Sequence, residues 1–308
     1  MKAILVSALV LILSSIAAAK DEIQIGDLVK QHVSSIGSEQ ARAAIKTRVV
    51  QGNVKFRVLN VTSGNQDGKA VLVSEEDKLV SLLKLPNPTY HGERFVSDGS
   101  KTLIAEVRPG DYSEFGSFVR VHNEILTEGL WGGSLSTGWA VAHLEERHAK
   151  LQFRGLKKTG SEELYEVRYI PGKKSDLDIL LYFDPATFRH VKTVYSLTIA
   201  PPMGRTERES ASVQESHYRL EERFSDFKHS DNLMLPTHWV IQFTPDVPEE
   251  NVGRGGRGGA APLGAGPSGG QGGHFMLGAA HNAISEFEVN DASISHNVSL
   301  DPKNFEVK

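Results

Sequence analysis

The sequence predicts an α+β fold in which a largely antiparallel sheet of roughly ten to twelve strands curls into a cup covered by helices. Three observations predict it. Short segments with alternating apolar residues recur along most of the chain. Most connections between them are too short for the crossover that parallel strands need. Apolar residues at helical spacing are confined to the beginning and the middle of the chain.

The first predicted helical region is residues 22–46, where apolar residues lie three or four positions apart. Gly37 interrupts this pattern, and Ser38 is a good N-cap for a second helix. Both helices are amphipathic, so each requires an apolar surface to lie on.

Strands are predicted on both sides of a central helical region. The strands before it are 48–59, 70–73, 79–85, 94–96 and 101–107, and those after it are 151–156, 164–170, 178–183, 189–197, 216–224, 234–243 and 283–294. Between them, the spacing predicts a helix over 115–130 and a less regular one over 139–146. Because right-handed twist accumulates in such a sheet, it curls, and the inner side of the cup encloses an apolar cavity.

The N-terminus has the pattern of a secretory signal peptide. Lys2 is followed by the apolar residues 3–13 and by the small residues Ala17, Ala18 and Ala19. The apolar run is shorter than the roughly 20 residues that cross a bilayer. We therefore expect residues 1–19 to be removed near Ala19, leaving an exported, soluble domain over 20–308.

Composition indicates the cellular compartment of the protein and limits the partners that it can bind. The chain has no cysteine, which excludes disulfides and thiolate chemistry, and an exported chain of this kind is typical of a bacterial periplasm. The 34 basic residues are balanced by 38 acidic ones, so no nucleic-acid partner is expected. The glycine-rich stretch at about 250–275 predicts a flexible, disordered loop. Its G-x-G-x-x-G at Gly253, Gly255 and Gly258 lacks the flanking strand and helix of a dinucleotide site.

Four phrases of the sequence carry a resemblance to a known family. They are "DLVKQHVSSIGSEQARAAIKTRVVQGNVKFRV", "LLYFDPATFRHVKTVYSLTI", "YRLEERFSDFKHSDNLMLPTHWVIQF" and "LDPKNFEVK". Together they resemble the LolA/LolB-like periplasmic outer-membrane lipoprotein-sorting superfamily, and more narrowly a branch of exported soil-bacterial proteins. The resemblance implies an unclosed, strongly curved antiparallel β-barrel with helices over its concave face and an interior that receives acyl chains. No local motif matches the carrier family's docking surfaces, and the stretches around Trp131 and over 253–273 exceed a minimal carrier.

Candidate site residues follow from the cup. The candidates for the walls of the hydrophobic cavity are Phe56, Val58, Leu83, Phe183, Tyr195, Trp239 and Phe243. The candidates for a lid or mouth are Phe115, Phe118, Val119, Ile125, Leu126, Trp131 and Trp139. At any single one of the cavity positions, ordinary core packing is the more frequent role of such a side chain.

No motif predicts catalytic, cofactor-binding or metal-binding residues. His143 and His148 are five positions apart, which does not place them on one helix face for a shared metal ion. The stretch from Gly132 to Ser136 ends in serine where a nucleophile elbow needs glycine. A pair of glycosidase carboxylates cannot be picked out among so many acids.

We therefore expect a monomeric, non-enzymatic periplasmic protein that binds or carries acyl chains or lipoproteins, with peripheral membrane contact allowed. The first alternative is an envelope interaction or sensor module of the same fold with no lipid cargo. The second is an envelope hydrolase.

Overall fold

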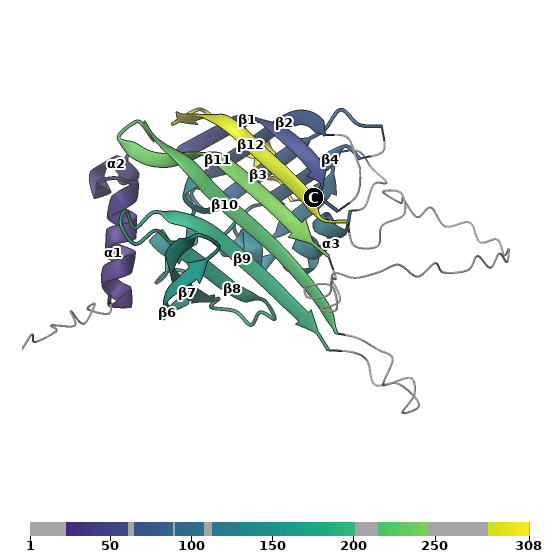
Figure 1. Ribbon diagram of the computed structural model, residues 1–308. Helices are drawn as coiled ribbons and strands as arrows, with labels where there is room; N and C mark the ends of the chain where they lie inside the picture. Colours follow the sequence, from purple (N-terminus) through teal and green to yellow (C-terminus); the bar gives the residue numbers. More distant parts are fainter. Residues whose placement is uncertain are drawn as a thin grey trace, which may run out of the picture.

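Twelve strands of the described residues form one sheet. The computed structural model describes residues 23–60, 65–88, 90–107, 113–200, 215–245 and 283–307. The strands are β1 (Thr47–Val58), β2 (Gln66–Glu75), β3 (Lys78–Lys84), β4 (Gly92–Ser97), β5 (Thr102–Glu106), β6 (Lys150–Thr159), β7 (Glu162–Ile170), β8 (Asp178–Phe183), β9 (His190–Ile199), β10 (Ser216–Ser230), β11 (Leu233–Thr244) and β12 (Ser285–His296). Their order is β5-β4-β3-β2-β1-β12-β11-β10-β9-β8-β7-β6 (Figure 1).

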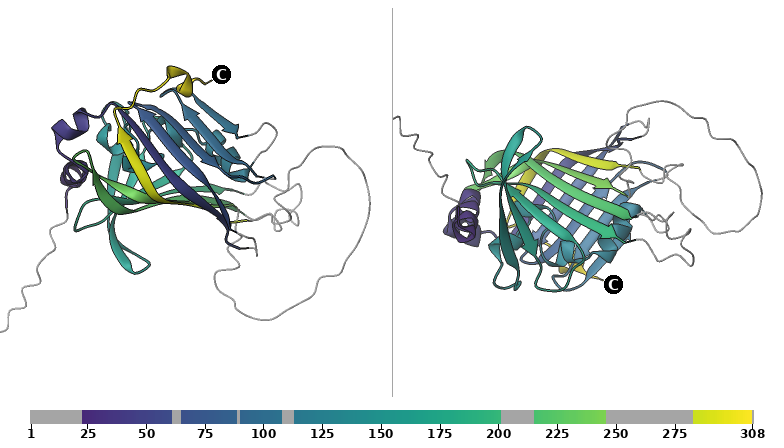
Figure 2. Two further views of the ribbon diagram at one scale, coloured as in Figure 1. Left: turned by 90° about the horizontal axis from the view of Figure 1, so that it is seen from above. Right: turned by 60° about the horizontal axis from the view of Figure 1, so that its bottom comes forward.

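The sheet is antiparallel throughout and does not close. Each neighbouring pair is antiparallel, and β5 and β6 form the two edges. The sheet curves strongly (Figure 2). Irregular registers in β1 between Gln51 and Asn53 and in β6 between Phe153 and Gly155 add local twist. The predicted fold, an unclosed and curved antiparallel barrel with helices on its concave side, is confirmed.

Two helices begin the described chain. Helix α1 (Ile25–Ile36) lies beside one end of the sheet, and the short α2 (Glu39–Ala43) follows it (Figure 1). Leu28, His32 and Ile36 are buried at intervals of four, which is one face of α1. The Ser38 hydroxyl accepts a hydrogen bond from the Ala41 amide at 3.1 Å, so the predicted N-cap is confirmed.

The middle helices are shorter than the spacing predicts. The region contains α3 (Glu114–Val121), α4 (Glu124–Thr127), and two 3-10 turns, η1 (Gly133–Leu135) and η2 (Ala140–Ala142); another, η4 (Pro302–Phe305), lies near the C-terminus. The prediction of one helix over 115–130 is wrong because His122 leaves the helical conformation at φ −105° and ψ 58°. The prediction of a helix over 139–146 is also wrong, because this stretch consists of turns and the short η2. Next to these turns, Arg147 donates hydrogen bonds to the carbonyl oxygens of Thr127 and Gly138.

The core lies between the concave face of the sheet and the segment that joins β5 to β6. In β1, Val50, Val54 and Phe56 are buried on one side, as alternation requires. Phe56 pairs in register with Phe287 of β12, and their ring centroids are 4.8 Å apart. The large apolar side chains of neighbouring strands therefore line a common inner surface.

Two sequence predictions lie outside the described residues. The signal peptide over 1–19 and the glycine-rich loop at about 250–275 both fall in ranges that the structure does not describe. Within the described ranges, no helix has both the length and the apolarity that crossing a bilayer requires.

Candidate functional site

Residues 113–149, called the lid segment here, connect the two edges of the sheet across its concave side. The segment begins next to β5, and α3 packs against that strand, whereas η1 contacts β9 and β11 and η2 contacts α1. Its regular elements are α3, α4, η1 and η2, so the described part of the lid segment contributes no strand to the sheet. It is therefore attached to the concave face mainly through its side chains and a few polar contacts.

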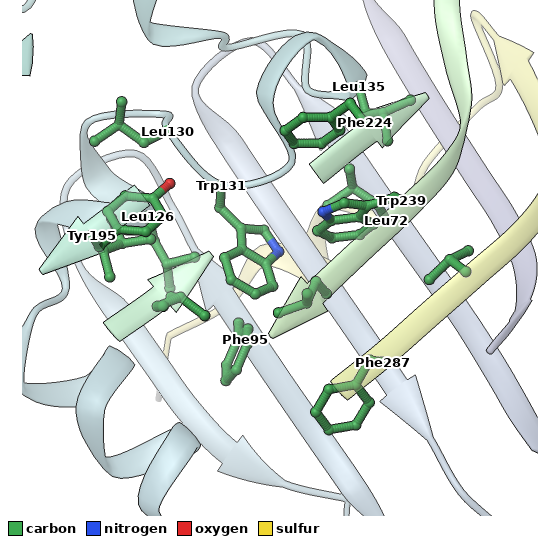
Figure 3. Packing of buried hydrophobic residues seen from close by; sticks show 14 of the residues in the cluster. Leu72, Phe95, Leu126, Leu130, Trp131, Leu135, Tyr195, Phe224, Trp239 and Phe287 are labelled. Atoms are coloured by element: carbon green, nitrogen blue, oxygen red, sulfur yellow. The ribbon is translucent and has the colours of Figure 1, made fainter. Parts of the chain in front are cut away.

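Aromatic rings of the lid segment occupy the centre of the concave face. Trp131 lies edge-on to Phe95 of β4 at 5.2 Å and to Trp239 of β11 at 5.4 Å between ring centroids (Figure 3). The ring centroid of Phe115 lies 5.7 Å from those of both Phe243 and Phe287. These rings fill the space between the two sides of the curved sheet.

All of the predicted cavity and lid residues are buried. Those proposed for the cavity wall are Phe56, Val58, Leu83, Phe183, Tyr195, Trp239 and Phe243, and each is at most 8% exposed. Those proposed for the lid are Phe115, Phe118, Val119, Ile125, Leu126, Trp131 and Trp139, and each is at most 6% exposed. The structure brings the two sets into contact: Phe118 and Phe243, for example, are 5.4 Å apart between ring centroids. In this conformation, the concave face is packed against its own lid segment.

A buried carboxylate beneath the lid segment was not predicted. Glu222 of β10 is fully buried and accepts hydrogen bonds from the Gly132 amide at 2.9 Å, the Trp239 indole at 3.0 Å and the Tyr195 hydroxyl at 2.9 Å. Burial raises the pKa of Glu222 to about 7, although these hydrogen bonds act in the opposite direction. Its position between inward-facing Leu220 and Phe224 is the sequence signal that identifies it.

A second buried polar contact comes from Arg48 of β1. Its Nη1 donates to the Ser134 carbonyl oxygen of the lid segment at 2.7 Å, and its Nε donates to Nε2 of His296 at 3.0 Å. The His296 ring in turn bonds Asp231 through Nδ1 at 2.8 Å. Burial lowers the pKa of Arg48 to about 10, so the guanidinium remains charged at neutral pH.

Two buried histidines, His32 of α1 and His190 of β9, contact Trp139 of the lid segment. The Trp139 indole donates to Nε2 of His32 at 2.9 Å, and Nδ1 of His32 bonds the Phe188 carbonyl oxygen at the same distance. Burial lowers the pKa of His32 to about 4. The pKa of His190, whose ring centroid is 4.6 Å from that of Trp139, is also lowered by burial. Both imidazoles are therefore neutral at pH 7.

Polar contacts also hold other parts of the lid segment. The Tyr169 hydroxyl of β7 donates to Glu128 at 2.8 Å. Arg147 bonds two carbonyl oxygens of the lid segment and the Asp77 carboxylate in the turn between β2 and β3. The lid segment is thus tied to the sheet at several separate points.

A hollow of about 510 Å³ lies where α1 and α2 meet β1 and the lid segment. Its lining includes Ile36, Ile45, Arg48, Ser134, Trp139 and Glu146. None of the seven predicted cavity residues lines this hollow, whereas Trp139 of the predicted lid does. Sequence reasoning missed it because it is assembled from segments far apart in the chain.

The other polar groups considered in the sequence bond separate partners. Nδ1 of His143 pairs with Glu146 at 2.7 Å, and the exposed His148 has a positive φ of 53°. Ser136 accepts a hydrogen bond from the Gly138 amide. In the ranges that the structure describes, no three His, Asp or Glu side chains are grouped so that they could hold a metal ion.

Comparison with known proteins gives likenesses only among solved structures. No protein-family model matches the chain, and no curated protein matches it. A LolA superfamily protein from Nitrosomonas europaea is 10% identical, with a TM-score of 0.43, over 92% of this chain and 98% of that one.

Two further likenesses have the same low identity. A DUF1329 family protein from Desulfovibrio piger is 10% identical, with a TM-score of 0.44, over 92% of this chain and 97% of that one. A putative outer membrane lipoprotein-sorting protein domain from Vibrio parahaemolyticus is 10% identical, with a TM-score of 0.42, over 91% of this chain and 94% of that one.

Proposed function

We propose that this protein binds the acyl chain of a lipid or lipoprotein on its concave face, and that the chain enters by displacing the lid segment. The observation that carries the proposal is the nature of the cover: apolar side chains, with Trp131 and Phe115 at its centre, fill the concave face. Because these contacts are non-directional, a hydrocarbon chain can replace them without a specific polar partner.

The free energy gained by burying an acyl chain can be compared with the cost of displacing the lid segment. Each methylene that a ligand buries contributes about 0.8 kcal/mol, so a chain of about fifteen methylenes contributes about 12 kcal/mol. This gain has to offset the exposure of lid rings and the loss of contacts such as those of Arg48 and Glu222 with the lid backbone. The proposed activity is non-covalent and uses no catalytic group. It also agrees with export to a bacterial periplasm, which the N-terminal sequence predicts.

The test is uptake of a fluorescent long-chain fatty acid by delipidated protein, combined with hydrogen exchange of the lid segment. We expect saturable binding with one or a few ligands per chain, and faster exchange at the Gly132 amide in the complex. The exposed Val121 on α3 supplies a control: Val121→Asn should leave uptake unchanged because that side chain is 69% exposed.

A specific observation favours one other function. The interior is already filled by the protein's own side chains, as an interaction or sensor module of this fold requires. That function predicts no fatty-acid uptake at micromolar protein and an unchanged exchange rate at Gly132. This outcome would replace the acyl-binding proposal.

A further inference from the structure

The hollow of about 510 Å³ beside α1 and α2 has a buried floor and an exposed rim. The floor is made by Ile36, Arg48, Ser134 and Trp139, all of which are buried. At the rim, Ala43, Lys46 and Ala142 are among the exposed residues. The volume is within the range of roughly 300–1,000 Å³ that small-molecule sites occupy. The hollow is therefore large enough for an organic ligand that enters from solvent.

Arg48 is a buried charge at this floor without a carboxylate in contact. A guanidinium has five N–H donors, and two hydrogen bonds account for the partners of Arg48: Nη1 to Ser134 and Nε to His296. Within the described ranges, Nη2 bonds no residue and Arg48 forms no ion pair. A buried arginine is usually paired, because removing its charge from water is costly.

The geometry fixes Arg48 in an orientation suited to a ligand. The Ser134 carbonyl oxygen and the His296 ring hold two of its nitrogens, and Asp231 holds His296. This arrangement leaves Nη2 and the second N–H of Nη1 available for a planar oxyanion, which guanidinium groups bind through two parallel hydrogen bonds. Ser134 is itself a lining residue of the hollow, and its hydroxyl bonds none of the residues that the structure describes.

The acidic side chains of the hollow are placed differently. Glu39, Glu76, Asp77 and Glu146 are all exposed at the rim, where water screens their charges. Asp77 is also bonded to Arg147, and Glu146 to His143. The buried part of the hollow therefore carries a positive charge, while its negative charges lie in solvent.

We propose that the hollow binds a small amphiphilic anion, with its carboxylate or phosphate on Arg48 and Ser134 and its apolar part along Ile36, Ile45 and Trp139. The apolar part accounts for the aliphatic and aromatic walls, and the anion supplies the counter-charge that Arg48 lacks. The proposal does not depend on acyl binding in the concave face, since none of the predicted cavity residues lines the hollow.

The test is calorimetric titration of the mature protein at pH 7 with octanoate, octyl phosphate, inorganic phosphate and 1-octanol. We expect one site per chain for octanoate or octyl phosphate, with at least tenfold weaker binding of 1-octanol. Inorganic phosphate separates a free anion from an amphiphile. Binding as tight as that of octyl phosphate would support the contact with Arg48 and overturn the apolar part of the proposal.

Arg48→Met removes the charge and keeps much of the side chain's length. We expect it to weaken octyl phosphate binding at least tenfold, whereas Arg168→Met, at an arginine whose side chain is 43% exposed, should leave binding unchanged. Equal affinities in the wild type and Arg48→Met, or no binding of either charged amphiphile, would overturn the proposal.

A second variant keeps the test valid if Arg48→Met does not fold. Ala142 is exposed at the rim, so Ala142→Trp should fill the mouth of the hollow without disturbing the core. We expect it to block octyl phosphate while uptake of a long-chain fatty acid stays at the wild-type level. Unchanged octyl phosphate binding in Ala142→Trp would place that ligand elsewhere and contradict the proposal. Loss of long-chain fatty-acid uptake in Ala142→Trp would not bear on the hollow. It would count against the site proposed on the concave face.

Discussion

Glu222 and Arg48 are polar residues at inward positions of strands that otherwise present apolar side chains to the lid segment. Each reaches the lid backbone, Glu222 at the Gly132 amide and Arg48 at the Ser134 carbonyl oxygen. A buried polar group that loses its partner costs about 1–3 kcal/mol, and a buried charge costs more. These two residues therefore favour one position of the lid segment over others that satisfy the apolar contacts alone.

Glu222 should make stability depend on pH. Its folded pKa of about 7 is above the ordinary value of 4.5, so the folded state binds the proton more tightly than the unfolded state. The contribution of Glu222 to stability is then full below about pH 4.5 and falls by about 3 kcal/mol as pH rises through 7. Glu222→Gln removes this titration. We expect the variant to gain about that amount relative to wild type between pH 4.5 and 8, measured by urea unfolding.

The pKa of Glu221, on the same strand, is shifted in the opposite direction and serves as a comparison for Glu222. Burial acts to raise its pKa, but hydrogen bonds from Arg219 and Arg223 outweigh burial and lower it. The stability that this carboxylate contributes is therefore present above its ordinary pKa and is lost as pH falls, opposite in sign to the effect of Glu222. A difference between Glu222→Gln and wild type that does not vary with pH would show that Glu222 keeps an ordinary pKa.

At the scale of elements, period-two alternation predicted the strands well. The strand over 178–183 has the predicted limits, and β1 is displaced by one residue at each end. Alternation is informative here because strands such as β2 and β3 bury one face and not the other. The helices of the lid segment were predicted less well: α3 ends where His122 leaves the helical conformation, and Arg147 makes tertiary bonds next to the turns that replace the helix expected over 139–146. Propensity carries no information on such contacts.

For the candidate sites, the sequence predicted which residues are buried but not which surfaces could bind a ligand. The fourteen predicted cavity and lid residues are all inward or buried, because apolar periodicity reports burial. It does not report whether a buried surface faces a ligand or another side chain. The hollow at Arg48 could not be predicted, since α2, β1 and the lid segment meet only in the folded protein.

The turn that opens η1 gives a prediction for the lid segment as an element. Gly133 has a φ of 51°, and a Cβ at this position would lie 2.8 Å from Nδ1 of His190. Gly133→Ala combines backbone strain with a clash against a buried ring, so we expect a loss of about 3 kcal/mol in unfolding free energy. Thermal and urea unfolding measure the loss.

Gly160 in the turn between β6 and β7 is the matched position. Its φ is 63°, but nothing lies within 4 Å of an added Cβ. Gly160→Ala should therefore cost about 1 kcal/mol, from backbone strain alone. Equal losses at the two glycines would mean that the lid segment yields around the added methyl group and is not tightly packed on His190.

At the scale of the whole molecule, β11 and β12 are neighbours although 40 residues separate Thr244 from Ser285. Phe243 and Ser285 are partners in register, so the two ends of this connection are already close. The glycine-rich composition of residues 253–273 predicts a flexible connection, whose closure entropy changes slowly with length. Deleting 253–273 should leave the unfolding free energy within about 1 kcal/mol of wild type. A larger loss in urea unfolding would show that the deleted residues pack against the domain.

The two margins of the sheet, β5 and β6, are joined by the same segment that plugs the space between them. Because both ends of this segment continue into edge strands, the cover stays tethered to the domain when it is displaced. Its effective concentration at the concave face therefore remains high, which favours its return once a ligand leaves.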